Sequence, residues 1–237
     1  MSGWVKKRFW KQASVVETGD GFGVALDVRT LKTPAKADLI VPSRALALAI
    51  AAEWDAVEEK IDPRRMPVTR SANAAIDKVS AQHDEVADLI AAYGGTDLLC
   101  YRAERPQALI DLQTAAWDPY LDWAAQELSA PLSATQGVVH QTQPRDSLER
   151  LTALVHGLDA FELTAVHDLV SISGSLILGL AVARGRVDAE TAWPLSRVDE
   201  DWQAEQWGID DDAAELAESK RQDFLHAERF LELLRAE

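Results

Sequence analysis

The sequence predicts an α+β fold, with a small N-terminal β-rich domain followed by a larger, mainly α-helical C-terminal domain. Short runs of β-branched and aromatic residues, separated by glycine and proline, fill residues 9–42 and are typical of a small sheet. After them, apolar residues recur at the spacing of amphipathic helices. The proline-bounded stretch 61–67 is the best boundary. We therefore place one domain, with one helix, at residues 1–62 and the other at 63–237.

Composition limits the possible functions. Hydrophobic residues make up 47% and charged residues 27% of the 237, a balance typical of a globular protein. The net charge of −15 disfavours nucleic acid as a partner and favours a basic one. The single Cys100 excludes an intramolecular disulfide and a multi-cysteine zinc site. No apolar signal segment follows the basic residues near Met1, so we expect the mature chain to begin there and no membrane insertion.

The N-terminal segment predicts a hairpin and one helix. Residues 9–16 and 22–26 have strand character, and the Gly-Asp-Gly at 19–21 suits the turn between them. Two further short strands are expected at 31–34 and 39–42, each ending in proline. Ser43 is a good N-cap for a helix that runs to about Glu59 and buries Trp54.

The C-terminal domain is predicted to be a series of helices. We expect them at 68–79, 84–93, 109–128, 147–158, 172–182, from about 193 to 207, and 213–237. Asp118-Pro119 should bend or interrupt its helix. Residues 132–139 read as extended, and 96–101 fit either helix or strand.

A nearly uncharged run from Ile172 to Val182 predicts a helix that is buried on all its sides within the core of a soluble protein. It is too short to span a bilayer. Gly174 and Gly179 within it are interpreted as points of close approach to a neighbouring element, because glycine inside a helix otherwise costs stability.

The next predicted helix is acidic and contains two tryptophans. Leu195, Val198 and Trp202 share one stripe, while Glu200 and Trp207 fall on the opposite face. Four polar residues border the apolar stripe: Asp199 and Gln206 on one side, Asp201 and Glu205 on the other. This pattern suits a binding surface. An ordinary amphipathic helix with a solvated acidic face is the alternative, and periodicity alone favours it.

No motif predicts catalysis. The five histidines form neither HExxH nor an i, i+4 pair, and GxSxG is missing. Asp199, Asp201 and Glu205 could supply a paired-carboxylate hydrolase of unknown substrate, which we keep as the alternative function. Cys100 has apolar neighbours that should raise its pKa and leave it inert. Eight tryptophans without a cofactor signature favour binding to another protein.

An ordered set of segments covering almost the whole chain resembles one family: the assembly chaperones of the F-type ATP synthase catalytic head that bind the unassembled alpha subunit. The segments are VALDVR at 24–29, LKTP at 31–34, AEWD at 52–55, MPVTR at 66–70, DLLCYR at 97–102, WDP at 117–119 and SRVDEDWQ at 196–203. Two departures are Val28, where the family usually has glycine, and Pro194 inside its penultimate helix.

The resemblance implies a chaperone that is not an enzyme and needs no cofactor or metal. It would hold the free alpha subunit, mask the surface later covered by the beta subunit, and be a monomer when free. Asp199 resembles the family's functionally sensitive carboxylate, one methylene shorter than the usual Glu. We expect the partner-binding residues to be Asp199, Glu200, Trp202, Gln203, Gln206 and Trp207, and the structural residues to be Trp54, Gly174 and Gly179. The expected location is the bacterial cytoplasm; eukaryotic members would be in the mitochondrial matrix.

Overall fold

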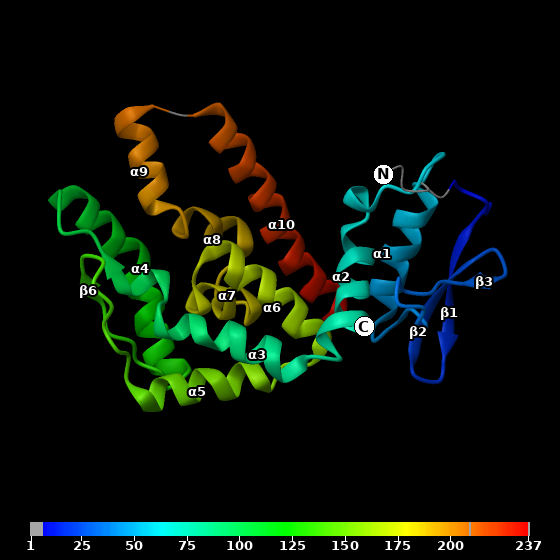
Figure 1. Ribbon diagram of the computed structural model, residues 1–237, viewed down its shortest axis with the longest axis horizontal. Helices are drawn as coiled ribbons and strands as arrows, with labels where there is room; N and C mark the ends of the chain where they lie inside the picture. The colour runs from blue at the N-terminus through cyan, green and yellow to red at the C-terminus, as the bar shows by residue number, and fades with distance from the viewer. Residues whose placement is uncertain (1–6, 209, 237) are drawn as a thin grey trace. The chain divides into compact units, whose positions relative to one another are not determined.

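The computed structural model describes residues 7–208 and 210–236. A small sheet near the N-terminus is followed by a mainly helical remainder, which confirms the predicted α+β class (Figure 1). The chain divides into two compact units. The first runs as far as His83 and takes in Ala160–Ala165 and the residues from Arg229 onward, whereas the second comprises Asp84–Asp159 and Val166–Glu228. The predicted boundary at 62–63 stays a prediction.

The sheet of the first unit is built around one central strand. β2 (Gly21–Leu26) pairs antiparallel with β1 (Ala13–Thr18), β3 (Arg29–Thr30) and β4 (Ile40–Val41). Gly21 begins β2 with φ 144°, and a Cβ there would lie 2.5 Å from the Val41 carbonyl oxygen. Only glycine fits both constraints. The predicted hairpin is confirmed.

α1 (Arg44–Asp55) packs on this sheet and begins at the predicted cap. The Ser43 hydroxyl accepts a hydrogen bond from Leu46 N at 3.1 Å. The same hydroxyl donates to the Leu233 carbonyl at 2.6 Å, so the last helix of the chain contributes to the first unit. The helix ends at Asp55, four residues before the predicted end at Glu59.

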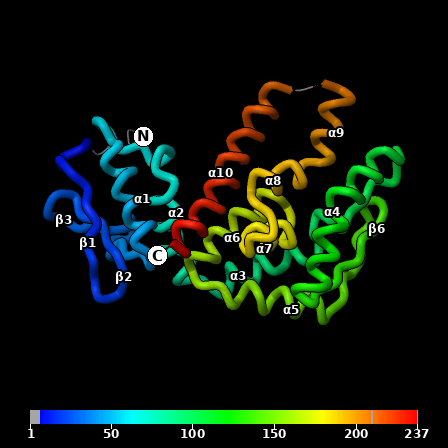
Figure 2. The backbone as a smooth tube through the Cα atoms, turned by 180° about the vertical axis from the view of Figure 1, so that it is seen from behind, coloured from blue at the N-terminus to red at the C-terminus, as the bar shows by residue number. Residues whose placement is uncertain are grey.

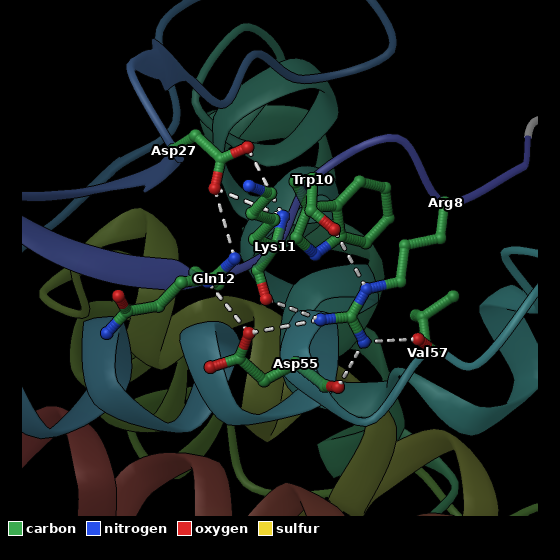
Figure 3. A network of polar contacts seen from close by, with 8 residues as sticks. Arg8, Trp10, Lys11, Gln12, Asp27, Asp55 and Val57 are labelled. Carbon is green, nitrogen blue, oxygen red and sulfur yellow. Dashed lines mark hydrogen bonds and ion pairs between the residues drawn. The ribbon is translucent and has the colours of Figure 1, made fainter.

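Arg8 ties the N-terminal segment to the C-terminal end of α1 (Figure 3). Its guanidinium donates to the carbonyls of Asp55 at 2.7 Å and Val57 at 2.6 Å, which lie where helix carbonyls lack partners. It also donates to the carbonyls of Trp10 and Lys11. One side chain thereby satisfies four backbone acceptors from two segments.

Glu53, from the AEWD segment, caps the next helix, α2 (Pro67–Ala74). Its carboxylate accepts from Val68 N at 2.7 Å, Thr69 N at 2.8 Å and the Thr69 hydroxyl at 2.6 Å. Burial raises the pKa of the Glu53 carboxyl, and the hydrogen bonds from Thr69 and Val68 oppose that rise. A single π-helical turn, Ala75–Val79, follows α2, so the predicted helix 68–79 exists but changes its winding.

Trp54 is half-buried and packs on Trp10, with ring centroids 5.2 Å apart. Trp54→Arg is expected to lower the free energy of unfolding by about 2–4 kcal/mol, because a charge would replace a large apolar ring that is only partly buried. Urea and thermal unfolding would measure the loss. Leu48→Arg on the same helix is the control: Leu48 is 49% exposed, so the same added charge should cost only about 0.5 kcal/mol. Equal melting temperatures for the parent and Trp54→Arg would contradict the packing role.

The second unit contains most of the helices (Figure 2). Their bounds are α3 His83–Ala91, α4 Gln107–Glu127, α5 Arg145–His156, α6 Ala160–Ser173, α7 Leu176–Ala183, α8 Ala189–Leu195, α9 Val198–Trp207 and α10 Asp211–Arg235. α6 and α10 also supply their Ala160–Ala165 and C-terminal portions to the first unit. Between the helices, β5 (Tyr101–Arg102) pairs parallel with β6 (Thr135–Gln136).

Two predictions about these helices were wrong, and one is tested in part. Pro119 does not interrupt α4, which is helical from Gln107 to Glu127, while a bend at Pro119 stays a prediction. The predicted core helix 172–182 is instead divided between α6 and α7 by Gly174, whose φ of 73° is left-handed and incompatible with a helix interior. The predicted acidic helix is likewise two helices, because α8 ends at Leu195 and α9 begins at Val198. Residues 96–101, which the sequence left open, form the 3₁₀ turn Leu98–Cys100 and the start of β5.

α7 is buried along its whole length, which confirms the predicted core helix from Leu176 onward. Gly179 lies close to α6: an added Cβ would lie 2.5 Å from Cγ2 of Val170. Its predicted packing role is therefore supported by the geometry. At Gly174, in contrast, an added Cβ would meet nothing closer than Leu98 Cβ at 3.9 Å, so that glycine serves the backbone turn.

Candidate functional site

The start of α9 is held against α4 in the second unit. The Trp117 indole Nε1 of α4 donates to the Leu195 carbonyl at 2.7 Å, at the end of α8. Three carboxylates, Asp199, Glu200 and Asp201, then occupy the first turn of α9, where the helix dipole favours negative charge. A short connection anchored on α4 therefore places this acidic turn.

Asp199 is positioned by a buried amide. Its Oδ1 accepts from Nε2 of Gln113 at 2.6 Å, and Gln113 is only 1% exposed. Oε1 of Gln113 accepts from Ala103 N at 2.8 Å. This acceptor role sets which end of the amide faces Asp199. The half-buried carboxylate is thus fixed by a residue 86 positions away in sequence.

Asp199 lines a groove of about 440 Å³, which we call the Asp199 groove. Its lining includes Tyr101, Arg105, Leu109, Gln113, Val138 and Gln203. Arg102, another lining residue, is 7% exposed and donates to Asp118 at 2.7 Å and to the Leu99 carbonyl at 3.0 Å. The Arg102 guanidinium also lies over the Trp117 ring, 5.2 Å from its centroid. Arg102 is therefore held by three contacts, whereas Val138, also in the lining, is 94% exposed.

A second groove lies on the other side of α9. It measures about 550 Å³ and runs between α9 and the first turns of α10; we call it the α9–α10 groove. Glu200 and Trp207, which the sequence placed opposite the apolar stripe, both line it, and Trp207 is 79% exposed. Gln203 lines both grooves.

The remaining predicted site residues lie outside these two linings. Trp202 is half-buried, and Gln206 is exposed. Leu195 does not continue the stripe of Val198 and Trp202 along one helix, because the chain breaks after α8. The apolar stripe is therefore two residues on α9 instead of three on a single helix.

The three carboxylates of the alternative hydrolase do not share a groove. Asp199 lines one groove, Asp201 lines the other, and Glu205 lines neither. A paired-carboxylate mechanism needs two carboxyl groups about 5–10 Å apart around one substrate. The structure does not favour that function.

The described side chains give little support to metal or thiol chemistry. Within residues 7–208 and 210–236, no three His, Cys, Asp or Glu side chains are grouped so as to hold a metal ion. Burial, with a smaller contribution from Asp97, raises the pKa of the Cys100 thiol to about 12. The thiol therefore stays protonated at neutral pH, as the sequence predicted. Over the same described residues, no helix combines the length and the apolarity required to cross a bilayer.

A family profile described as "ATP12 chaperone protein" matches residues 7–125, half of the chain. The chain belongs to the ATP12 chaperone family. Members of the ATP12 family are assembly chaperones of ATP synthase, so the resemblance seen in the sequence is confirmed.

Several ATP12 relatives match over most of their length. Protein atp12 from mitochondria of Schizosaccharomyces pombe is 28% identical over 224 residues, covering 89% of this chain and 76% of that protein. The crystal structure of Atp12 from Paracoccus denitrificans is 54% identical, with a TM-score of 0.95 and coverage of 97% of this chain and 98% of that one. The Atu1473 protein of Agrobacterium tumefaciens is 41% identical, with a TM-score of 0.91 and coverage of 98% and 87%.

Sequence reasoning missed Gln113, the residue that holds Asp199. A signal was present: Gln113, Trp117, Leu121 and Ala124 form the buried stripe of α4, and Gln113 is its one polar member. A polar residue at a buried helical position needs a hydrogen-bonding partner. Its identity, Asp199, could not be read from spacing because the two residues lie on different helices.

Proposed function

We propose that this ATP12-family protein binds the free alpha subunit of F-type ATP synthase and covers its beta-contacting surface until assembly. The observation that carries the proposal is the Asp199 carboxylate, held at the edge of a groove by the buried Gln113. A carboxylate fixed before binding loses little side-chain entropy when a partner arrives. Family membership supports an ATP synthase subunit as that partner.

The chemistry of Asp199 suits a donor on the client. The bond from Gln113 uses Oδ1, and a carboxylate has two oxygens that can each accept more than one hydrogen bond. A client arginine, lysine or backbone N–H would therefore find an acceptor already in place. Glu200, Trp202, Gln203, Gln206 and Trp207 remain the proposed contact residues around it.

Capture of the client tests the function directly. Tagged protein from a lysate of a bacterium that contains F-type ATP synthase should enrich the alpha subunit, most strongly when the beta subunit is depleted. Added beta subunit should release the alpha subunit, because both are proposed to cover the same surface. Failure to enrich the alpha subunit even without the beta subunit would exclude this function.

Asp199→Asn is expected to weaken alpha-subunit binding by about tenfold or more, because it removes the charge but keeps an oxygen that can accept from Gln113. Its melting temperature should stay close to that of the parent. Asp199→Ala should lose the same affinity and also about 1 kcal/mol of stability, since the Gln113 amide would be left without its acceptor. Binding is measured by calorimetry and stability by urea unfolding.

Asp122→Asn is the matched control, because it makes the same substitution at an exposed position of α4 that lines neither groove. Equal loss of binding for Asp199→Asn and Asp122→Asn would indicate long-range attraction to an acidic protein instead of a contact made by Asp199. Unchanged binding for Asp199→Asn would move the client site away from the Asp199 groove.

A further inference from the structure

The α9–α10 groove has apolar residues in its lining, including two tryptophans. Four alanines come from the two helices: Ala204, Ala213, Ala214 and Ala217. Trp193 lines the groove and is 8% exposed, whereas Trp207 is 79% exposed. α9 and α10 are the orange and red-orange helices of Figure 1. A large exposed indole beside small apolar residues is typical of a protein-binding surface.

The rim of this groove is strongly acidic. Residues 198–219, which form α9 and the start of α10, contain nine Asp or Glu and no Lys or Arg. Glu200, Asp201, Asp210 and Glu218 line the groove. A hydrogen bond from Gln222, together with the charge of Arg221, lowers the pKa of Glu218, so that this carboxyl stays ionised at neutral pH.

Among the described residues that line the groove, Arg197 is the one cation, and it is already engaged. Its guanidinium lies 3.5 Å from Asp201 and 3.9 Å from Glu200, and it covers the Trp193 ring at 5.5 Å from the centroid. Arg221, outside this lining, pairs with Glu218 at 3.2 Å. Two arginines cannot neutralise the nine carboxylates of residues 198–219, so the groove keeps a negative potential around its alanines and tryptophans.

We propose that the α9–α10 groove binds a basic amphipathic helix, whose apolar face contacts Trp207 and the alanines and whose lysines or arginines meet the acidic rim. Alanines on α9 and α10 allow the backbone of a third helix to approach closely, and helix-in-groove binding uses this combination of apolar anchors and flanking charge. This inference rests on the proposed function in assigning that helix to the alpha subunit. The groove is separate from the Asp199 groove, so the client would contact α9 on both sides.

The chemistry can be tested with a defined probe. The probe is a synthetic helix of about 18 residues with leucines on one face and lysines on the other, and the comparison peptide has glutamate in place of lysine. Calorimetry with the full chain should detect binding of the lysine peptide, weakened as ionic strength rises, and no binding of the glutamate peptide. Changes in the NMR chemical shifts of backbone amides on addition of the lysine peptide should fall on α9 and α10. Equal binding of both peptides, or shifts confined elsewhere, would overturn the proposal.

Two variants test the apolar and charged parts of the groove. Trp207→Ala should weaken binding of the lysine peptide by about tenfold or more, and so should the pair Asp201→Asn and Glu218→Gln. The controls are Leu112→Ala, at a leucine 48% exposed on α4, and the pair Asp122→Asn and Glu127→Gln, which removes two charges from exposed positions of α4. The controls should change the affinity by less than about twofold. If the charge pair on α4 weakened binding as much as the groove pair, the attraction would be to net charge alone. If Leu112→Ala weakened binding as much as Trp207→Ala, the apolar contact would not be specific to the groove. Either result would overturn the site.

The same variants separate this inference from the proposed function. If the parent captures the alpha subunit and Trp207→Ala captures it equally well, the groove assignment fails while the proposed function stands. If the parent binds the lysine peptide in the groove but captures no alpha subunit, the groove chemistry stands and the proposed function fails. Weaker capture of the alpha subunit by Trp207→Ala supports both.

Discussion

Asp97→Ala is expected to lower the free energy of unfolding by about 2–4 kcal/mol at pH 7. Asp97 is fully buried and accepts three hydrogen bonds, from Leu99 N at 3.0 Å, the Ser175 hydroxyl at 2.7 Å and Ile177 N at 3.0 Å. It therefore joins the 3₁₀ turn before β5 to the N-terminus of α7. Alanine would leave three buried donors without this acceptor, and each such loss costs about 1–3 kcal/mol. Removing the Asp97 carboxylate also removes the desolvation cost of a buried charge, which offsets part of this loss of stability.

Burial of Asp97 should also make the stability of the protein depend on pH. Burial raises the pKa of Asp97 from 3.8 to about 6, against the opposing hydrogen bonds from Ile177, Ser175 and Leu99. Because the folded protein holds this proton more tightly than the unfolded chain, the stability contributed by proton binding is complete below pH 3.8 and is lost as the pH rises through 6. The loss amounts to about 3 kcal/mol, at about 1.4 kcal/mol per pKa unit.

Urea unfolding at several pH values between 4 and 7 would measure this slope. Asp97→Asn removes the titrating group, so its stability should change less over that range than that of the parent. Asp122→Asn, at an exposed position of α4, serves as the control and should leave the slope unchanged. Identical slopes for the parent and Asp97→Asn would show that Asp97 does not titrate in this range.

Gly179→Leu is expected to cost about 3 kcal/mol or more. A Cβ at this position would lie 2.5 Å from Cγ2 of Val170, 3.3 Å from its backbone nitrogen and 3.4 Å from its Cα. The valine side chain could rotate, but the backbone of α6 is held by its own helical hydrogen bonds, so α6 and α7 must separate. Gly179→Ala should show a smaller part of the same loss, measured by thermal unfolding.

Gly174→Leu provides the contrast to Gly179→Leu. Its Cβ would have room, with the nearest atom 3.9 Å away, but its φ of 73° costs a residue with a side chain about 1–2 kcal/mol. Gly174→Ala should therefore cost nearly as much as Gly174→Leu, whereas the two substitutions at Gly179 should differ. A parent-like melting temperature for Gly179→Leu would mean that the two helices are not in close contact there.

Local chemistry allowed much of the fold to be predicted. The hairpin follows from Gly19-Asp20-Gly21 between two strand-forming runs, and α1 begins at Ser43 because its hydroxyl caps the helix. The helix breaks were harder to predict. Gly174 ends α6 where the apolar pattern continues without interruption, since hydropathy reports burial and not backbone direction. Pro119 removes one backbone donor from α4, yet the helix continues across it.

The candidate site was predictable only in part. The acidic turn of α9, and the placement of Glu200 and Trp207 away from the stripe of Val198 and Trp202, follow from helical periodicity. The hydrogen bond from Gln113 and the anchoring of Leu195 by Trp117 join residues 86 and 78 positions apart. Such contacts depend on how helices pack, and spacing along one sequence carries no information about them.

The first unit is assembled from three separate stretches of chain, with consequences for synthesis on the ribosome. Residues from Arg229 onward belong to it, including the buried Phe230 and Leu231, and Ser43 bonds to the Leu233 carbonyl across 190 residues. Domains usually fold in order of emergence. Here the sheet and α1 are translated first, yet their unit stays incomplete until residues 229–236 have also left the ribosome. A chain truncated before Arg229 would therefore be defective in the unit that contains its N-terminal sheet.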